Sequence, residues 1–192
     1  MTRLRSADLG PSVLDPAAFI QEVAFLVEVR PLGDRLFAEI GEHLRRLAAR
    51  PDLLAEPLAA LPGTGASVRL LAQHRSGPSL FLARLGGREP GPVHDHGSWG
   101  VLCIISGRSR MTHWARLDAG IDRDRASVHP LGERILGPGD VAWFGGPPDD
   151  IVSHEGLEGD VLALAVFGRN PTLGRRTRFD TATGRVSRSG PA

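Results

Sequence analysis

Hydrophobic residues recur with two different periods along this chain, and the change of period divides it in two. In the first third, apolar residues stand three or four apart, as in Phe19, Ile20, Val23, Leu26 and Val27, which is the spacing of a helix with one buried face. Asp15 before Pro16 is typical of a helix start. The spacing predicts three helices, over residues 16–27, from 34 to just before Pro51, and from 52 to about 61.

Beyond residue 65, short apolar runs separated by Gly, Pro and Asp replace the helical spacing. They predict eight strands, over residues 68–74, 80–85, 101–106, 110–117, 128–136, 141–144, 161–167 and 176–180. Many short strands at this spacing favour a β-sandwich or barrel. Because no long linker interrupts the chain, residues 1–62 are expected to form an α-helical cap packed on an all-β core of residues 63–192. We expect a loose lead-in over 1–14 and a frayed end over 186–192.

Composition narrows the possible functions. The 192 residues carry a net charge of +1, too little to attract nucleic acid or a membrane surface. No apolar run is long enough to span a bilayer, and the first residues lack the apolar core of a signal peptide, so a cytoplasmic monomer or homodimer is expected. All 23 basic residues are Arg, which excludes Schiff-base lysine chemistry and a P-loop lysine. Cys103 is the only cysteine, which excludes an internal disulfide and favours a core position.

Two histidines, His94 and His96, stand one residue apart in an extended stretch, so their side chains are expected on the same side. Such a pair suits a metal, although imidazole binds zinc, copper, iron and nickel alike. We predict His154 as the third ligand. His113 and His129 are the alternatives, although their segments are interpreted as outer strand and loop.

The remaining polar and aromatic residues have simpler interpretations. Asp95 is expected to point away from the metal and to make a structural hydrogen bond. Trp99 is expected in the core, with a pocket wall as the alternative. His43 is interpreted as a surface residue and His74 as a strand-end residue, and neither is given a role.

Several motifs in the β-region together resemble the cupin family. They are the His-x-His turn, the apolar strand that closes at Gly107, the turn Pro138-Gly139-Asp140, and a further histidine beyond it. Cupins are jelly-roll barrels that hold a metal in the mouth of the barrel. Most cupins have a glutamate soon after the histidine pair, but residues 97–100 contain no carboxylate. This narrows the resemblance to thiol dioxygenases of the cysteine dioxygenase type, whose iron is held by three histidines.

The bacterial 3-mercaptopropionate dioxygenase branch is the closest match, because residues 92–100 answer its Pro-x-His-Asp-His-x-x-Trp-Gly signature. The resemblance implies Fe(2+) held by His94, His96 and His154. It implies oxidation of a small thiol by O2 to a sulfinic acid. It also implies that Arg176 corresponds to the arginine that binds the substrate carboxylate, with a solvated basic edge over residues 175–178 as the alternative.

One departure from that branch affects the expected chemistry. The family's Ser-x-His-x-Tyr sequence, which supplies polar groups beside the iron, is replaced by Ala163, Ala165 and Phe167. We therefore expect a more apolar pocket and either a different thiol or a different reaction. Two alternatives stay open: a metal-binding cupin that binds or senses a small molecule with little catalysis, and an isomerase or lyase that uses zinc, nickel or manganese.

Overall fold

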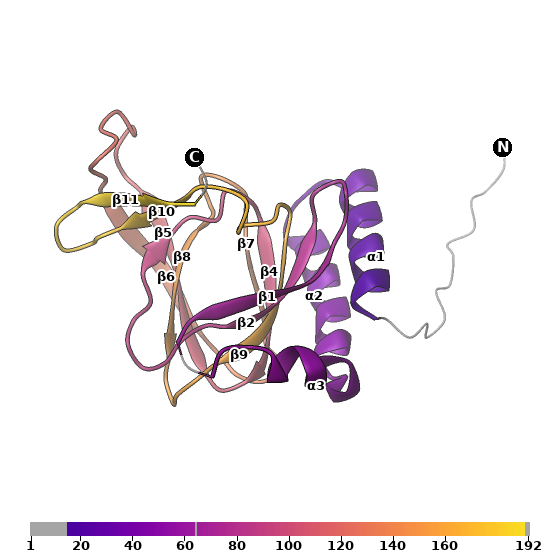
Figure 1. The fold of residues 1–192 in the computed structure, drawn as a ribbon. Coiled ribbons are helices and arrows are strands. Elements are labelled where there is room, and N and C mark those ends of the chain that lie inside the picture. The colour runs from indigo at the N-terminus through magenta and orange to yellow at the C-terminus, as the bar shows by residue number, and fades with distance from the viewer. Residues whose placement is uncertain (1–14, 64, 191–192) are drawn as a thin grey trace, which may run out of the picture.

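Three layers are stacked side by side in this protein: helices, a five-stranded sheet and a six-stranded sheet (Figure 1). The computed structural model describes residues 15–63 and 65–190. The predicted lead-in over residues 1–14 lies outside this range.

The three predicted helices are present, with ends shifted by two residues at most. Their bounds are α1 Pro16–Val29, α2 Asp34–Ala48 and α3 Pro51–Ala59. Asp15 caps α1, because its carboxylate accepts a hydrogen bond from the backbone N–H of Ala18 at 2.7 Å. The interpretation of His43 as a plain surface residue is wrong. It lies half-buried between α1 and α2, with Nδ1 3.0 Å from Oε2 of Glu22.

The β-region contains more strands than the hydrophobic pattern predicts. The strands are β1 Ser67–Gln73, β2 Ser79–Arg84, β3 Val93–His94, β4 Gly100–Ser106, β5 Ser109–Arg116, β6 Val128–Leu136, β7 Val141–Phe144, β8 Ile151–Gly156, β9 Leu162–Phe167, β10 Arg176–Phe179 and β11 Val186–Ser189. Strands β3, β8 and β11 were not predicted. The expected frayed end is wrong for residues 186–189, because β11 pairs along its whole length with β10.

The strands form two antiparallel sheets packed face to face. The first has the order β1-β2-β9-β4-β7 and the second β11-β10-β3-β8-β5-β6. This double-layered arrangement is a jelly-roll β-sandwich, which agrees with the all-β core of the predicted fold class. Sequence neighbours such as β3 and β4 lie in opposite sheets, so the segment between them crosses from one sheet to the other.

The central strands of the five-stranded sheet, β2, β9 and β4, are buried on both faces. Side chains such as Val101, Cys103 and Leu164 share a hydrophobic cluster with the helices. Their neighbours Leu102 and Ala163 pack between the two sheets. This explains why residues 101–105 are continuously apolar, and it confirms the core position of Cys103. The helices and the sheet share one cluster, although the division at residue 62 stays a prediction.

Among residues 15–63 and 65–190, no helix combines the length and the apolar character needed to cross a lipid bilayer.

Candidate functional site

The histidine pair lies on the inner face of the six-stranded sheet. His94 is in β3, where it stands opposite Val152 of β8. Residues directly opposite each other in a sheet share a face, and Val152 packs between the sheets, so His94 faces the interior. The rings of His94 and His96 have centroids 4.6 Å apart, as the alternating pattern predicts for neighbours on one side.

A buried carboxylate shapes the turn that presents His96. Oδ2 of Asp150 accepts hydrogen bonds from the backbone N–H groups of His96 at 3.1 Å and Gly97 at 2.6 Å. Gly97 has φ of +65°, a left-handed conformation that favours glycine. Burial raises the pKa of the Asp150 carboxyl, while the two N–H groups oppose that rise. Sequence reasoning gave Asp150 no role, and its position just before an apolar strand was the only signal.

Asp95 makes a structural hydrogen bond, as predicted. Its Oδ1 accepts the backbone N–H of Thr177 at 2.8 Å, and its own N–H donates to the Thr177 carbonyl at 3.0 Å. These two bonds attach the histidine segment to β10.

Two phenylalanines enclose the ring of His96. Phe144 stacks on it with a centroid distance of 4.6 Å, and Phe167 with one of 5.1 Å. A Cβ atom at Gly100 would lie 2.4 Å from Cζ of Phe144, so glycine is needed there to admit that ring. Both ring nitrogens of His96 are buried without a hydrogen-bond partner. Sequence reasoning identified Phe167 only as a replaced tyrosine, and it missed Phe144.

The pair is held in the neutral form that binds metals. Nδ1 of His94 lies 2.9 Å from the Pro92 carbonyl, which can only accept, so Nδ1 carries the proton and Nε2 is free as a ligand. Burial lowers the pKa of His94, and the positive charge of Arg176 lowers it further. Burial also lowers the pKa of His96 to well below its ordinary value, with further contributions from His94 and Arg176.

His154 lies on the same inner face but one pleat further along β8. It is two residues from Val152, so the two side chains share a face. Its Nδ1 is 3.5 Å from Oγ of the buried Ser109. Burial, followed by the charges of His94 and His113, lowers the pKa of His154 to about 3.

The donors suit a metal in their chemistry, but only the pair is assembled. Across the part of the chain that the structure describes, no three His, Cys, Asp or Glu side chains are grouped closely enough to hold an ion. The β8 residue directly opposite His94 is Val152. His154 is two residues further along β8 and therefore lies diagonal to His94. Binding through three histidines therefore needs a side-chain rearrangement, and His154 as the third ligand stays a prediction.

The two alternative ligands differ in position. His113 of β5 stands opposite Val152, so it faces the interior, and burial lowers its pKa. The interpretation of His113 as an outer residue is therefore wrong. His129 lies exposed on β6, the edge strand of the sheet.

Arg176 lies near the histidine pair. It is two residues from Arg178, which stands opposite His94, so all three side chains share the inner face. Nε of Arg176 is buried without a partner. Trp99 is a core residue, as expected: it is 6% exposed, and its ring centroid lies 5.6 Å from that of Phe37 on α2.

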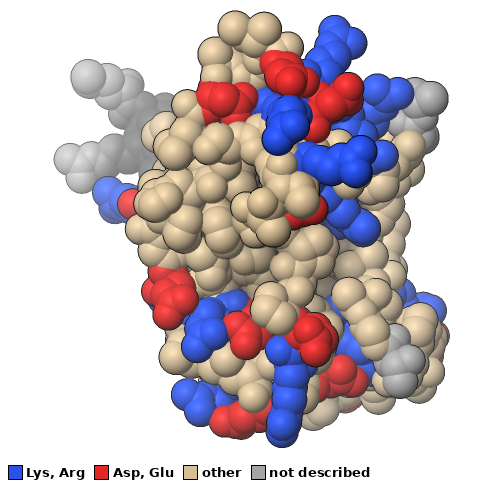
Figure 2. Space-filling model, turned by 90° about the vertical axis from the view of Figure 1, so that its left-hand side faces the viewer, with Lys and Arg blue, Asp and Glu red and all other residues tan. Residues whose placement is uncertain are grey.

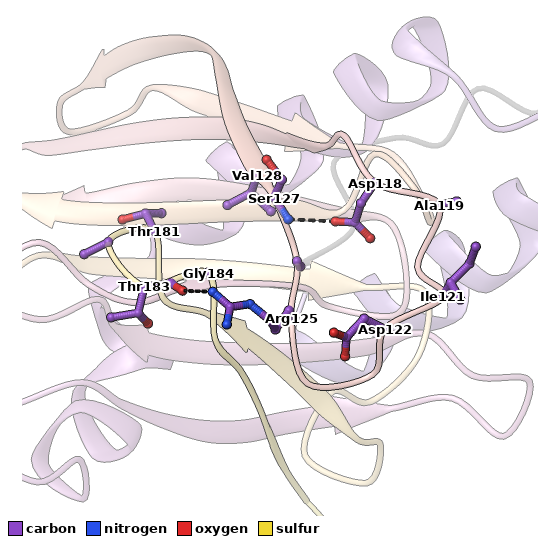
Figure 3. Close-up of a pocket in the computed structure, with 12 residues that line it drawn as sticks. Asp118, Ala119, Ile121, Asp122, Arg125, Ser127, Val128, Thr181, Thr183 and Gly184 are labelled. Atoms are coloured by element: carbon purple, nitrogen blue, oxygen red, sulfur yellow. Dashed lines mark hydrogen bonds between the residues drawn. The ribbon is translucent and has the colours of Figure 1, made fainter.

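The opposite, outer face of the six-stranded sheet carries two cavities, of about 850 and about 650 Å³. In Figure 2, which shows the side of the molecule that is at the left in Figure 1, a broad uncharged surface lies between charged groups above and below. The smaller cavity is bordered by groups that already bond to one another (Figure 3). Asp118 accepts the N–H of Ser127 at 2.7 Å, and Arg125 donates to the Thr183 carbonyl at 3.2 Å. Neither cavity is lined by the histidine pair.

Three known proteins to which this chain is similar share 16% sequence identity or less with it. No protein-family model matches the chain. A cupin superfamily protein from Desulfitobacterium hafniense is similar at 16% identity and a TM-score of 0.41, over 57% of this chain and 82% of that one. A DMSP lyase from Ruegeria pomeroyi has 14% identity and a TM-score of 0.47, over 86% and 77%. An oxalate oxidase has 13% identity and a TM-score of 0.43, over 57% and 54%. At these identities, none of the three indicates what this chain binds or converts.

Proposed function

We propose that the chain is a metal-dependent cupin enzyme that oxidises a small, carboxylate-bearing thiol to a sulfinic acid with O2. His94, His96 and His154 would hold Fe(2+). The observation that carries the proposal is the ring of His96, whose two buried nitrogens have no hydrogen-bond partner. The ring lies next to that of His94, whose Nε2 is free to bind a metal. Buried polar atoms without partners are costly, and a metal ion bound to one of the two nitrogens would remove part of that cost.

The reaction needs only the thiol and dioxygen, because RSH + O2 gives RSO2H with both oxygen atoms on sulfur. Bound iron would supply the activation of both reactants. The planar guanidinium of Arg176 suits paired hydrogen bonds to the carboxylate, which would orient the thiol toward the histidines. Phe144 and Phe167 pack on the ring of His96 and limit the access of water to it.

A second function is favoured by the incomplete ligand set. Because the described residues offer no three-ligand cluster, the same fold would also suit a cupin that binds or senses a small molecule without catalysis. An isomerase or lyase that uses zinc, nickel or manganese would share the histidines but would not consume oxygen.

Elemental analysis of protein purified without added metal, combined with oxygen uptake in the presence of small thiols, separates these functions. We expect about one iron per chain, lost in His96→Ala and retained in His129→Ala, which removes an exposed histidine. Unchanged iron in His96→Ala would mean that the site is misplaced. Bound zinc, nickel or manganese without oxygen uptake would favour the isomerase or lyase, and absence of metal would favour the binding protein.

A further inference from the structure

Two arginines stand on the same face of β10 as the histidine pair. Arg178 is opposite His94 in the register between β10 and β3, while Phe179 is opposite Val93. Phe179 and Val93 share a cluster on the outer face, so the alternation places Arg178 and Arg176 on the inner face. Arg178 also borders the outer cavity of about 850 Å³, but its register opposite His94 places its side chain on the inner face.

Neither guanidinium has a carboxylate partner. Among the ion pairs within residues 15–63 and 65–190, none includes Arg176 or Arg178. Asp95 is the neighbouring acid, but its Oδ1 accepts the backbone N–H of Thr177. Arg176 is half-buried, and a cation in that position without a partner is costly. The pair of arginines therefore leaves two positive charges for a ligand.

We propose that the substrate of this site is a small thiol with two anionic groups, one bound by Arg176 and the other by Arg178. The inference rests on the proposed function and narrows its substrate class. Residues two apart in a strand are separated by roughly 6.6 Å, and both side chains are long and flexible, so they can reach the two carboxylates of a four-carbon diacid. The half-buried Arg176 would anchor the carboxylate nearer the histidines, and the exposed Arg178 would hold the second one at the rim.

The surroundings favour charge as the basis of selectivity. Phe144, Phe167 and Ala165, which lie between the sheets next to the histidines, offer no hydrogen-bond donors from their side chains. Beside the histidine pair, the long cationic side chains that can bind an anionic tail are the two guanidinium groups of β10. A thiol with one carboxylate would leave one of the two cations without a partner.

Calorimetric binding of succinate and butyrate tests this substrate class without the reaction. Both are thiol-free four-carbon acids, with two carboxylates and one. We expect the wild-type protein to bind succinate at least tenfold more tightly than butyrate. Arg178→Gln should weaken succinate binding about tenfold and leave butyrate binding unchanged, because hydrogen bonds between charged groups are the strong ones. The matched control is Arg175→Gln, which removes the same charge from an exposed neighbour just outside β10 and should change succinate binding less than twofold.

Equal binding of succinate and butyrate would overturn the proposal. Equal weakening by Arg178→Gln and Arg175→Gln would also overturn it, because the effect would then be general electrostatics. Oxygen uptake with mercaptosuccinate and 3-mercaptopropionate distinguishes failure of the two-anion substrate proposal from failure of the proposed oxygenase function. Preferential oxidation of mercaptosuccinate supports both proposals, and preference for 3-mercaptopropionate overturns the two-anion substrate alone. Arg178-dependent succinate binding without oxidation of any thiol supports the anion site and overturns the oxygenase.

Discussion

Replacement of Asp150 by Ala tests how the turn that carries His96 is held. The carboxylate is 3% exposed and accepts two backbone N–H groups, from His96 and Gly97, which Ala would leave without a partner. Hydrogen bonds to a charged group contribute about 1.5–3 kcal/mol each, or roughly 3–6 kcal/mol for two. Part of this is offset because Ala also removes a buried charge, whose unfavourable burial raises the pKa of Asp150. We therefore expect a loss of about 2–4 kcal/mol in the free energy of unfolding.

Urea unfolding followed by tryptophan fluorescence measures this loss, with Asp149→Ala as the matched control. Asp149 is the preceding residue, carries the same charge and is exposed, so its removal should change the free energy of unfolding by less than about 0.5 kcal/mol. If Asp150→Ala were as stable as Asp149→Ala, the carboxylate would not hold the turn. Asp150→Asn keeps one acceptor oxygen and should fall between the two.

Two further predictions concern the inner face. Gly100→Ala would place a Cβ atom 2.4 Å from Phe144, so we expect a loss of about 1–3 kcal/mol in urea unfolding. Gly132→Ala, which meets no atom within 4 Å, serves as the control, and equal losses would refute the packing argument.

His154 has a pKa of about 3 in the folded protein, so between pH 6.5 and that value its imidazole takes up a proton only in the unfolded chain. Acidification of the metal-free protein from pH 6.5 to 5 should therefore cost about 1–2 kcal/mol through His154 alone. The buried His94 and His96 add losses of their own, because their pKa values are lowered as well. His154→Gln should therefore reduce the total loss by about the contribution of His154, while His129→Gln leaves the loss unchanged, and an unchanged pH dependence in His154→Gln would contradict the assigned burial.

The strands that the pattern missed show where local sequence stops being informative. Strand β3 has two residues, and β8 contains Ser153, His154 and Glu155 between its apolar start and its end. Neither has the alternation of a longer strand, and both exist because neighbouring strands provide hydrogen-bond partners in the register of the sheet. The strand β11 likewise forms by pairing with β10, although Val186 is its only apolar residue.

By itself, the sequence determined the elements whose information is local: helices with one apolar face, strands buried on both faces, and a pair of histidines set on one side by the two-residue period of an extended chain. The surroundings of that pair depend on contacts between segments that are distant in the sequence. Asp150 is 54 residues from His96 and Phe167 lies on another sheet, so their approach depends on strand order. The register of β3 with β8 sets Val152, rather than His154, opposite His94. Register is a property of pairing between distant segments, and a shift of one residue turns every side chain to the other face.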